Sequence, residues 1–356
     1  MTSSAPQSAS DSTSSPVELG LDTFGDVTLD EQGQPLPFAQ VLRNVVAQGV
    51  LADQVGLDFF GVGEHHREDF AVSAPDVVLA AVAARTERIR LGSAVTVLSS
   101  DDPVRVFQRF STLDGISGGR AEVILGRGSF TESFPLFGYD LAQYEQLFSE
   151  KLDLFTQVRR QQPVTWSGST RAPLTRQRVF PPLEHGLLPT WIGVGGSPES
   201  IVRTARYGLP LLLAIIGGAA ERFAPLVELY HHALEQLEQP TQPIGVHSPG
   251  HVGETDAQAR EDLWPHYKAM LDRIGRERGW APMTRAQFDQ EAGPDGALYV
   301  GSPETVAGKI ARTVKLLGLS RFDLKYSNGT LSHDLQLRSI ELYGTEVAPR
   351  VRELLG

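Results

Sequence analysis

Residues 89–128 read IRLGSAVTVLSSDDPVRVFQRFSTLDGISGGRAEVILGRG, and they decide the fold because they hold one complete strand-helix-strand unit. Residues 89–98 are apolar and rich in β-branched side chains, which is typical of a strand buried on both faces. Residues 121–125 form a second run of the same kind. Two strands joined by a helix of this length must run parallel.

The residues that bound the helix of this unit are also informative. Asp102 suits the N-cap and Pro103 the first helical turn, while the glycine pair 118–119 ends the helix. Both strands run into small or polar residues, Ser99-Ser100 after the first and Gly126-Arg127-Gly128 after the second. In parallel α/β folds the carboxyl ends of the strands carry the chemistry, so we expect the functional site at this edge.

The same alternation recurs along the chain and predicts eight strands, each followed by a helix. The predicted strands cover residues 17–24, 57–63, 89–98, 121–125, 189–194, 209–216, 243–251 and 321–326. This count and order favour a (β/α)8 TIM barrel over an open doubly wound sheet. Residues 161–188 and 280–296 do not fit the alternation, and we interpret them as irregular insertions in one domain that spans residues 17–356.

Composition excludes several classes of protein. Hydrophobic residues make up 41% of the 356-residue chain and charged residues 21%, as in soluble globular proteins. A net charge of −11 argues against a nucleic-acid partner, and the absence of cysteine excludes disulfides and thiol chemistry. No apolar run approaches a bilayer span, so we expect a cytoplasmic protein with no membrane partner. Residues 1–16 are rich in Ser, Thr and Ala and lack the features of a signal peptide, which indicates a disordered tail.

Residues 59–66, FFGVGEHH, end a predicted buried strand in Glu64, His65 and His66. The barrel topology places these side chains at the mouth, where one histidine could act as a general base or as a hydrogen-bond partner of a reactive oxygen species. Imidazole and carboxylate also bind metals, but no HExxH motif or Asp-rich cluster accompanies the pair. A loop that happens to hold two histidines is the alternative.

Two further segments are candidate phosphate sites. Arg127 follows a predicted strand and is flanked by glycines, so its planar guanidinium could approach two oxygens of a phosphate; the alternative is a surface ion pair. Residues 191–200, WIGVGGSPES, lead from a strand into a helix whose first amides would face the barrel mouth, with Ser197 as N-cap. The alternative here is simply a well-capped helix. A Rossmann interpretation is weak because GVGGS lacks the Gly-x-Gly-x-x-Gly spacing.

GVGEHHREDF at residues 61–70 and STLDGISGGRAEVILGRGSF at residues 111–130 resemble segments of the bacterial luciferase-like flavin monooxygenases. By this resemblance His65 supports the chemistry at the flavin ring, with Glu64 orienting it, and Arg127 binds the flavin phosphate. The resemblance also implies a cis peptide between Ala94 and Val95 beneath the ring. The remaining cofactor contacts that it implies come from Val194, Gly195, Gly196, Ser197 and Ser200. Luciferase itself commonly has an acidic residue at the position of Gly196, so that side-chain contact is missing here.

The resemblance implies a monooxygenase that uses reduced FMN and O2 on a small organic substrate. It further implies a homodimer and a separate NAD(P)H:flavin reductase as partner. Three alternatives stay open: a hydride transferase that uses the deazaflavin F420 on the same fold, a non-catalytic flavin-binding protein, and a divalent-metal hydrolase. Side chains that could also approach the mouth or line a substrate pocket are Phe24, Ser99, Ser100, Phe107, Phe130, Phe134, Phe137, Trp166, His247, His251, Tyr326 and Asn328.

Overall fold

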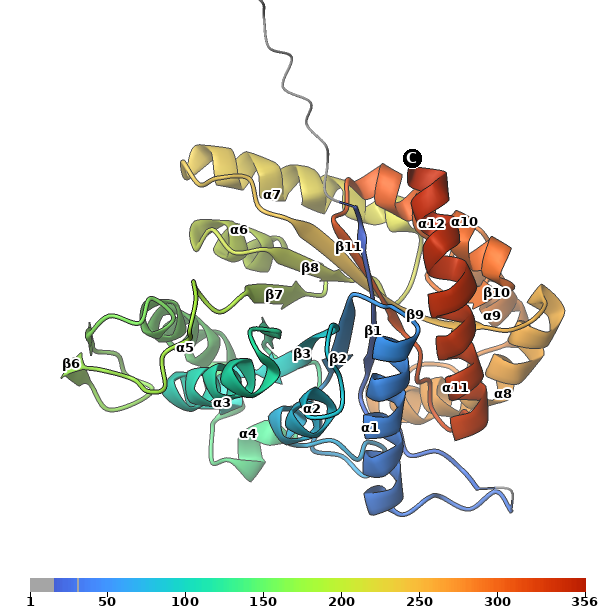
Figure 1. The fold of residues 1–356 in the computed structure, drawn as a ribbon, viewed down its shortest axis with the longest axis horizontal. Helices are drawn as coiled ribbons and strands as arrows, with labels where there is room; N and C mark the ends of the chain where they lie inside the picture. The colour runs from blue at the N-terminus through green and yellow to red at the C-terminus, as the bar shows by residue number, and fades with distance from the viewer. Residues whose placement is uncertain (1–15, 31) are drawn as a thin grey trace, which may run out of the picture.

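The computed structural model describes residues 16–30 and 32–356. Within them eight parallel strands form a closed barrel (Figure 1), which confirms the predicted fold class. Around the barrel the strands are β1 (Glu18–Thr23), β2 (Phe59–Val62), β3 (Arg90–Val97), β4 (Ala121–Gly126), β7 (Thr190–Val194), β8 (Leu211–Ala214), β9 (Ile244–Val252) and β11 (Arg321–Lys325), and β11 pairs with β1. The predicted tail, apart from Pro16, lies outside the described residues.

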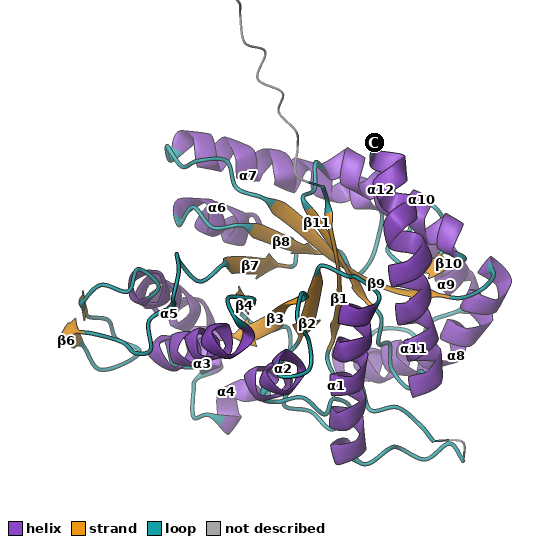
Figure 2. Cartoon of the chain, viewed as in Figure 1, coloured by secondary structure: helices purple, strands orange, loops and turns teal. Residues whose placement is uncertain are grey.

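Helices cover the outside of the barrel (Figure 2). They are α1 (Phe38–Gln54), α2 (Pro75–Ala83), α3 (Pro103–Ser117), α5 (Tyr144–Val158), α6 (Pro198–Arg206), α7 (Ala224–Gln236), α8 (Asp256–Arg278), α10 (Pro303–Leu317), α11 (His333–Leu342) and α12 (Ala348–Leu355), with the shorter α4 (Ser133–Leu136) and α9 (Arg285–Glu291). A π-helical turn, Tyr343–Val347, joins α11 to α12. Among the described residues, no helix is both long and apolar enough to cross a bilayer.

The central strand-helix-strand unit forms as its sequence predicts. The side chain of Asp102 accepts hydrogen bonds from the backbone N–H groups of Val104 and Arg105, and Pro103 occupies the first turn of α3. Gly118 ends the helix in the left-handed conformation, with φ of 69°. The helix therefore returns the chain to the barrel so that β4 pairs parallel to β3.

The two insertions contain regular structure. Residues 161–188 include an antiparallel hairpin of β5 (Val164–Trp166) and β6 (Leu174–Gln177). The interpretation of residues 280–296 as irregular is wrong in part, because α9 lies within them and begins with a capping box between Thr284 and Gln287. A three-residue strand, β10 (Tyr299–Gly301), extends parallel from β9 and was also missed, since so short a run carries little periodicity.

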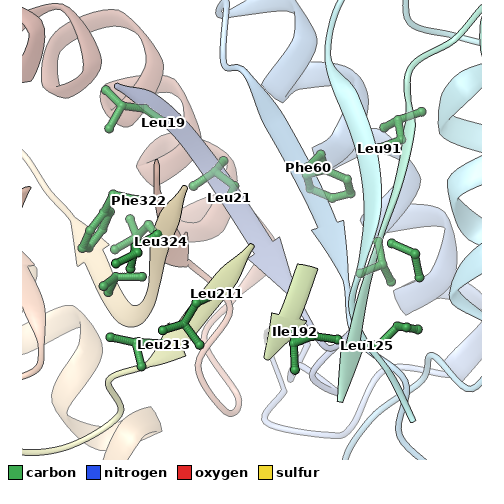
Figure 3. Close-up of a cluster of buried hydrophobic side chains, with 14 of the residues drawn as sticks. Leu19, Leu21, Phe60, Leu91, Leu125, Ile192, Leu211, Leu213, Phe322 and Leu324 are labelled. Atoms are coloured by element: carbon green, nitrogen blue, oxygen red, sulfur yellow. The ribbon is translucent and has the colours of Figure 1, made fainter. Parts of the chain in front are cut away.

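Alternate residues of the strands face two different environments. One set packs outward against the helices and forms the main core. The members that Figure 3 labels are Leu19, Leu21, Phe60, Leu91, Leu125, Ile192, Leu211, Leu213, Phe322 and Leu324. The other set fills the barrel and includes a separate apolar cluster of Phe59, Ala94, Ile124, Trp191 and Leu212. This division follows from the two-residue period of a strand.

The barrel interior also holds a buried ion cluster that the sequence did not reveal. Arg321 has no exposed surface; its Nε donates to both carboxylate oxygens of Asp323, at 3.0 and 2.9 Å, and its Nη1 donates to Glu122. The guanidinium lies 3.5 Å from the centroid of the Phe59 ring. Because Arg321 is the first residue of β11, this cluster fills the end of the barrel opposite to the carboxyl ends of the strands.

Candidate functional site

A cavity of about 440 Å³ opens at the carboxyl ends of the strands. Most of the predicted site residues line it: Glu64, His65, Ala94, Val95, Arg127, Val194, Gly195 and Ser200. Gly196 and Ser197 do not. Of the further candidates, Phe24, Phe130, His247 and Asn328 line the cavity, whereas Ser99, Ser100, Phe107, Phe134, Phe137, Trp166, His251 and Tyr326 do not. The topology therefore brings residues distant in sequence to one end of the barrel, as expected for this fold.

Glu64 follows β2 and is 8% exposed. Its Oε2 accepts a hydrogen bond of 2.9 Å from the Val97 backbone N–H, and its Oε1 lies 2.9 Å from His66 Nε2. The expectation that Glu64 orients His65 is therefore wrong. Successive side chains of an extended segment point to opposite sides, so the carboxylate reaches the histidine two residues on.

The His65 imidazole lies among aromatic rings. Its centroid is 4.4 Å from that of Phe70, 4.5 Å from Phe24 and 5.3 Å from Phe130. Burial, together with the nearby positive charge of Lys325, lowers the pKa of His65 to about 3. The ring is thus neutral near pH 7, where it can donate or accept a hydrogen bond but does not serve as a cationic acid.

This lowered pKa predicts a pH dependence of stability. The pKa of a histidine is 6.5 in an unperturbed chain and about 3 for His65 in the folded protein. As pH falls below 6.5, the unfolded chain takes up a proton that the folded protein does not. His65 should therefore reduce the free energy of unfolding by up to about 1.4 kcal/mol for each pH unit.

Urea unfolding measures this effect. Between pH 7.5 and 5, the free energy of unfolding should fall less steeply for His65→Gln than for the wild type. His231→Gln, at an exposed site on α7, should keep the wild-type slope. Parallel curves for all three proteins would contradict the assignment.

The floor of the cavity is formed around Ala94 and Val95, and the peptide bond between them is cis. The pairing of β3 with β4 shifts register between Ala94 and Thr96. Two glycines pack closely on Val95: a Cβ added at Gly126 would lie 2.5 Å from Val95 Cγ2, and one at Gly193 would lie 2.9 Å from Val95 Cγ1. These glycines give Val95 room at the bottom of the cavity.

Arg127 follows β4 and takes part in what we call the anion cluster, formed by Arg127, Glu145, Ser200 and Arg203. Nη1 of Arg127 donates to Oε1 of Glu145, and Nη2 of Arg203 donates to Oε2 of the same carboxylate at 2.6 Å. The Glu145 side chain is 57% exposed, whereas that of Arg203 is 17% exposed. Arg127 thus lines the cavity, as expected of a phosphate-binding residue, and also forms an ion pair, as the alternative interpretation expects.

The start of α6 adds further donors to the anion cluster. Ser197 caps the helix: its Oγ accepts a hydrogen bond from the Ser200 N–H at 3.3 Å and donates to Glu199. Ser200 Oγ and Arg203 Nη1 are buried and have no hydrogen-bond partner among the described residues. Two guanidinium groups, an unsatisfied hydroxyl and a helix N-terminus are the groups that bind a phosphate, so the anion cluster fits one.

Sequence reasoning missed Arg203 and Glu145. Arg203 lies three residues after Ser200, which places both on one face of α6, and this spacing is the signal that could have found it. Glu145 is on α5, and nothing local to it indicates its contact with Arg127.

Ion pairs join the segments around the mouth of the cavity. Arg67, after β2, contacts Asp69, Glu132 and Glu277, and the last of these is on α8. Arg67 also lies over the Phe130 ring, 4.4 Å from its centroid. These contacts connect the segment after β2, the segment after β4 and α8. Within the described ranges, no group of three or more His, Cys, Asp or Glu residues is placed to hold a metal ion.

The chain belongs to the luciferase-like monooxygenase family, because the model of that family matches residues 23–321. It is 23% identical over 379 residues to the alkanal monooxygenase alpha chain of Photorhabdus laumondii, an alignment that covers 93% of this chain and 98% of that one. The family membership agrees with the resemblance seen in residues 61–70 and 111–130.

Solved structures have the same fold. The oxygenating constituent of 3,6-diketocamphane monooxygenase from Pseudomonas putida, a type II Baeyer-Villiger monooxygenase in complex with FMN, aligns with a TM-score of 0.76 and 17% identity over 95% of this chain and 99% of that one. An F420-dependent secondary alcohol dehydrogenase in complex with an F420-acetone adduct aligns with a TM-score of 0.73 and 15% identity, again over 95% and 99% of the two chains.

Proposed function

We propose that this protein is a monooxygenase that uses reduced FMN and O2 to oxidise a small organic molecule. The observation that carries the proposal is the anion cluster beside a largely apolar cavity, because FMN combines a phosphate with a flat apolar ring. Membership of the luciferase-like family and the FMN complex of the diketocamphane enzyme support it.

Different residues around the cavity would contact different parts of the cofactor. Arg127, Ser200 and the capped start of α6 would hold the phosphate, and Ala94, Val95, Val194 and Gly195 would flank the ring. When bound, reduced flavin would supply the electrons that activate O2. His65 would offer a neutral hydrogen bond inside the cavity, and the aromatic rings around it would exclude water.

The proposal includes the other expectations drawn from the sequence. A separate NAD(P)H:flavin reductase would deliver the reduced flavin, which accords with the description of the diketocamphane protein as an oxygenating constituent. Residues 17–356 would form one domain, and the protein would act as a homodimer in the cytoplasm.

F420-dependent hydride transfer is the second candidate. The F420-dependent alcohol dehydrogenase shares the fold, and F420 also carries a phosphate that the anion cluster fits. The two functions differ in the use of oxygen, because a deazaflavin does not activate it.

The test is an anaerobic titration of the protein with oxidised FMN, reduced FMN and F420, followed by fluorescence and by heat. Tighter binding of reduced FMN than of oxidised FMN or F420 would support the monooxygenase. Binding of F420 alone would favour hydride transfer, and binding of none would contradict both. His65→Ala tests the catalytic role of His65 separately from flavin binding. If this variant binds flavin and retains every activity, His65 has no catalytic role.

We predict that Glu145→Gln binds FMN about 1.4- to 5-fold more tightly than the wild type does, since an exposed ion pair is worth about 0.2–1 kcal/mol. The carboxylate neutralises Arg127 and Arg203 and repels a phosphate, whereas glutamine does neither. Calorimetric titration of both proteins measures the change, and riboflavin, which lacks the phosphate, should bind equally to both. Weaker FMN binding by the variant would show instead that Glu145 holds the arginines in position.

A further inference from the structure

A second polar group faces the cavity on the side formed by β1, β9 and β11. Nδ1 of His247, on β9, lies 2.6 Å from Oδ2 of Asp22, on β1. In the sheet β11 lies between these two strands, so the two side chains meet inside the barrel. Asp22 is 1% exposed, and among the described residues the only hydrogen bond of its carboxylate is the one to His247. The Nδ1–H group therefore donates to a buried, otherwise uncompensated carboxylate.

The other ring nitrogen of His247, Nε2, remains available as a hydrogen-bond acceptor. With the proton on Nδ1, Nε2 carries a lone pair, and in the described part of the chain Nε2 has no hydrogen-bond partner. His247 lines the cavity, and its ring stacks on that of Phe24 with a centroid separation of 6.0 Å and an interplanar angle of 15°. The stacking and the Asp22 contact fix the ring, so Nε2 presents an acceptor to whatever occupies the cavity.

Several other ionisable groups lie around His247. On β11, Lys325 also lines the cavity, but its Nζ already donates to Asp26, at 3.2 Å, and to the backbone oxygen of Ser327. His65, in the segment after β2, contacts Phe24, the ring on which His247 stacks, and among the described residues it has no carboxylate hydrogen-bond partner. The groups contributed by each neighbouring element are Asp22 and Asp26 from β1 and the loop after it, His65 from the loop after β2, and Asp323 and Lys325 from β11.

The walls of the cavity near α8 and β8 are largely apolar, although Tyr267 and Arg278 of α8 also line it. Side chains of Met270, Leu271 and Ile274 line it from α8, with Leu212 and Ala214 from β8 and the rings of Phe70 and Phe130. Such walls suit an uncharged, preferably aromatic body. Where such a body lies beside Nε2 of His247, a hydrogen-bond donor on it would find a fixed acceptor.

We propose that His247, backed by Asp22, is the base that accepts the hydroxyl proton of a phenol-class substrate. This inference rests on the proposed function of the cavity as an oxidoreductase site. The O–H bond of the phenol breaks, its electron pair stays on oxygen, and the proton forms the Nε2–H bond of an imidazolium ion. The Nδ1–H group continues to donate to Asp22. The summed charge of the phenol, His247 and Asp22 is the same before and after the transfer. The resulting phenolate ring is richer in electrons and is therefore easier to oxidise.

The test uses 4-nitrophenol, whose phenolate absorbs visible light, bound to the full-length protein over a range of pH. Bound to the wild type, the phenol should ionise at a lower pH than it does free in solution. His247→Gln should raise that midpoint by about one to three pH units, as expected when a neighbouring opposite charge is lost. Asp22→Asn retains the ring but removes the charge behind it, and should shift the midpoint in the same direction.

His251→Gln is the matched control, since His251 is on the same strand but does not line the cavity; it should keep the wild-type midpoint. Thermal unfolding checks that each variant folds. The proposal is overturned if the midpoints of wild type and His247→Gln coincide, or if only Lys325→Gln moves the midpoint. It is also overturned if FMN displaces the phenol, because the phenol would then occupy the place of the ring. FMN titrations distinguish a failure of this proposal from a failure of the proposed function. If the wild type lowers the ionisation midpoint of 4-nitrophenol but binds no flavin, the role of His247 as a base is supported and the proposed function is contradicted.

Discussion

Replacement of Arg127 by alanine is expected to weaken FMN binding by about 10- to 100-fold, since a hydrogen bond to a charged group contributes about 1.5–3 kcal/mol. Arg127 and Ser200 both line the cavity, and the buried Ser200 hydroxyl has no hydrogen-bond partner in the described part of the chain. The Arg127 guanidinium can donate two hydrogen bonds to a phosphate. The loss should appear in a calorimetric or fluorescence titration with FMN.

Riboflavin and a second arginine provide the controls for this prediction. Riboflavin lacks the phosphate, so Arg127→Ala should bind it as the wild type does. Arg206→Ala removes an exposed arginine from the end of α6 away from the anion cluster and should bind FMN normally. Equal losses for FMN and riboflavin would mean that the substitution disturbs the cavity as a whole, and the phosphate role of Arg127 would then be wrong.

The second large effect is on stability. Arg321→Met should lower the free energy of unfolding by about 3–5 kcal/mol, because it leaves the carboxylates of Glu122 and Asp323 buried without their partner. Urea unfolding followed by circular dichroism measures this change. The loss comes from unpaired charge, not from lost volume, since Met also fills much of the space.

A compensated variant tests this cause. When Glu122→Gln and Asp323→Asn accompany Arg321→Met, the charges are removed together, and we expect recovery of more than half of the lost stability. If the triple variant is as unstable as Arg321→Met, the packing of the guanidinium on the Phe59 ring is the dominant contribution instead.

The barrel could be predicted because each of its parts has a local sequence signal. The strands are short apolar runs. Asp102 and Pro103 mark the start of α3 through contacts within one helical turn. The carboxyl ends of the strands follow directly from this order, which is why Arg127 and His65 could be placed near the site. The family resemblance located the Ala94–Val95 cis peptide, which residue patterns alone would not suggest.

The contacts that connect the site were beyond local patterns. Asp22 and His247 are separated by 225 residues along the chain, and their contact depends on the twist and closure of the barrel. Arg321 appears in the sequence as a charged residue at the start of an apolar strand, and only the register of β11 directs it toward Glu122, 199 residues away. Such pairs form because the barrel closes, and not because of the local conformational preference of either segment.

The ion pairs of Arg67 bear on the rate at which molecules enter and leave the cavity. They join three segments of the mouth through charges of which Glu132 is 37% and Glu277 45% exposed. The Arg67 side chain is itself only 8% exposed, but these two carboxylates are readily solvated once they separate from it, so opening the mouth costs less than parting an apolar contact of the same extent. Salt screens these attractions, with a Debye length of about 8 Å at physiological ionic strength. The residence time of substrate and product should therefore shorten as the ionic strength rises, while the interior of the barrel is unaffected.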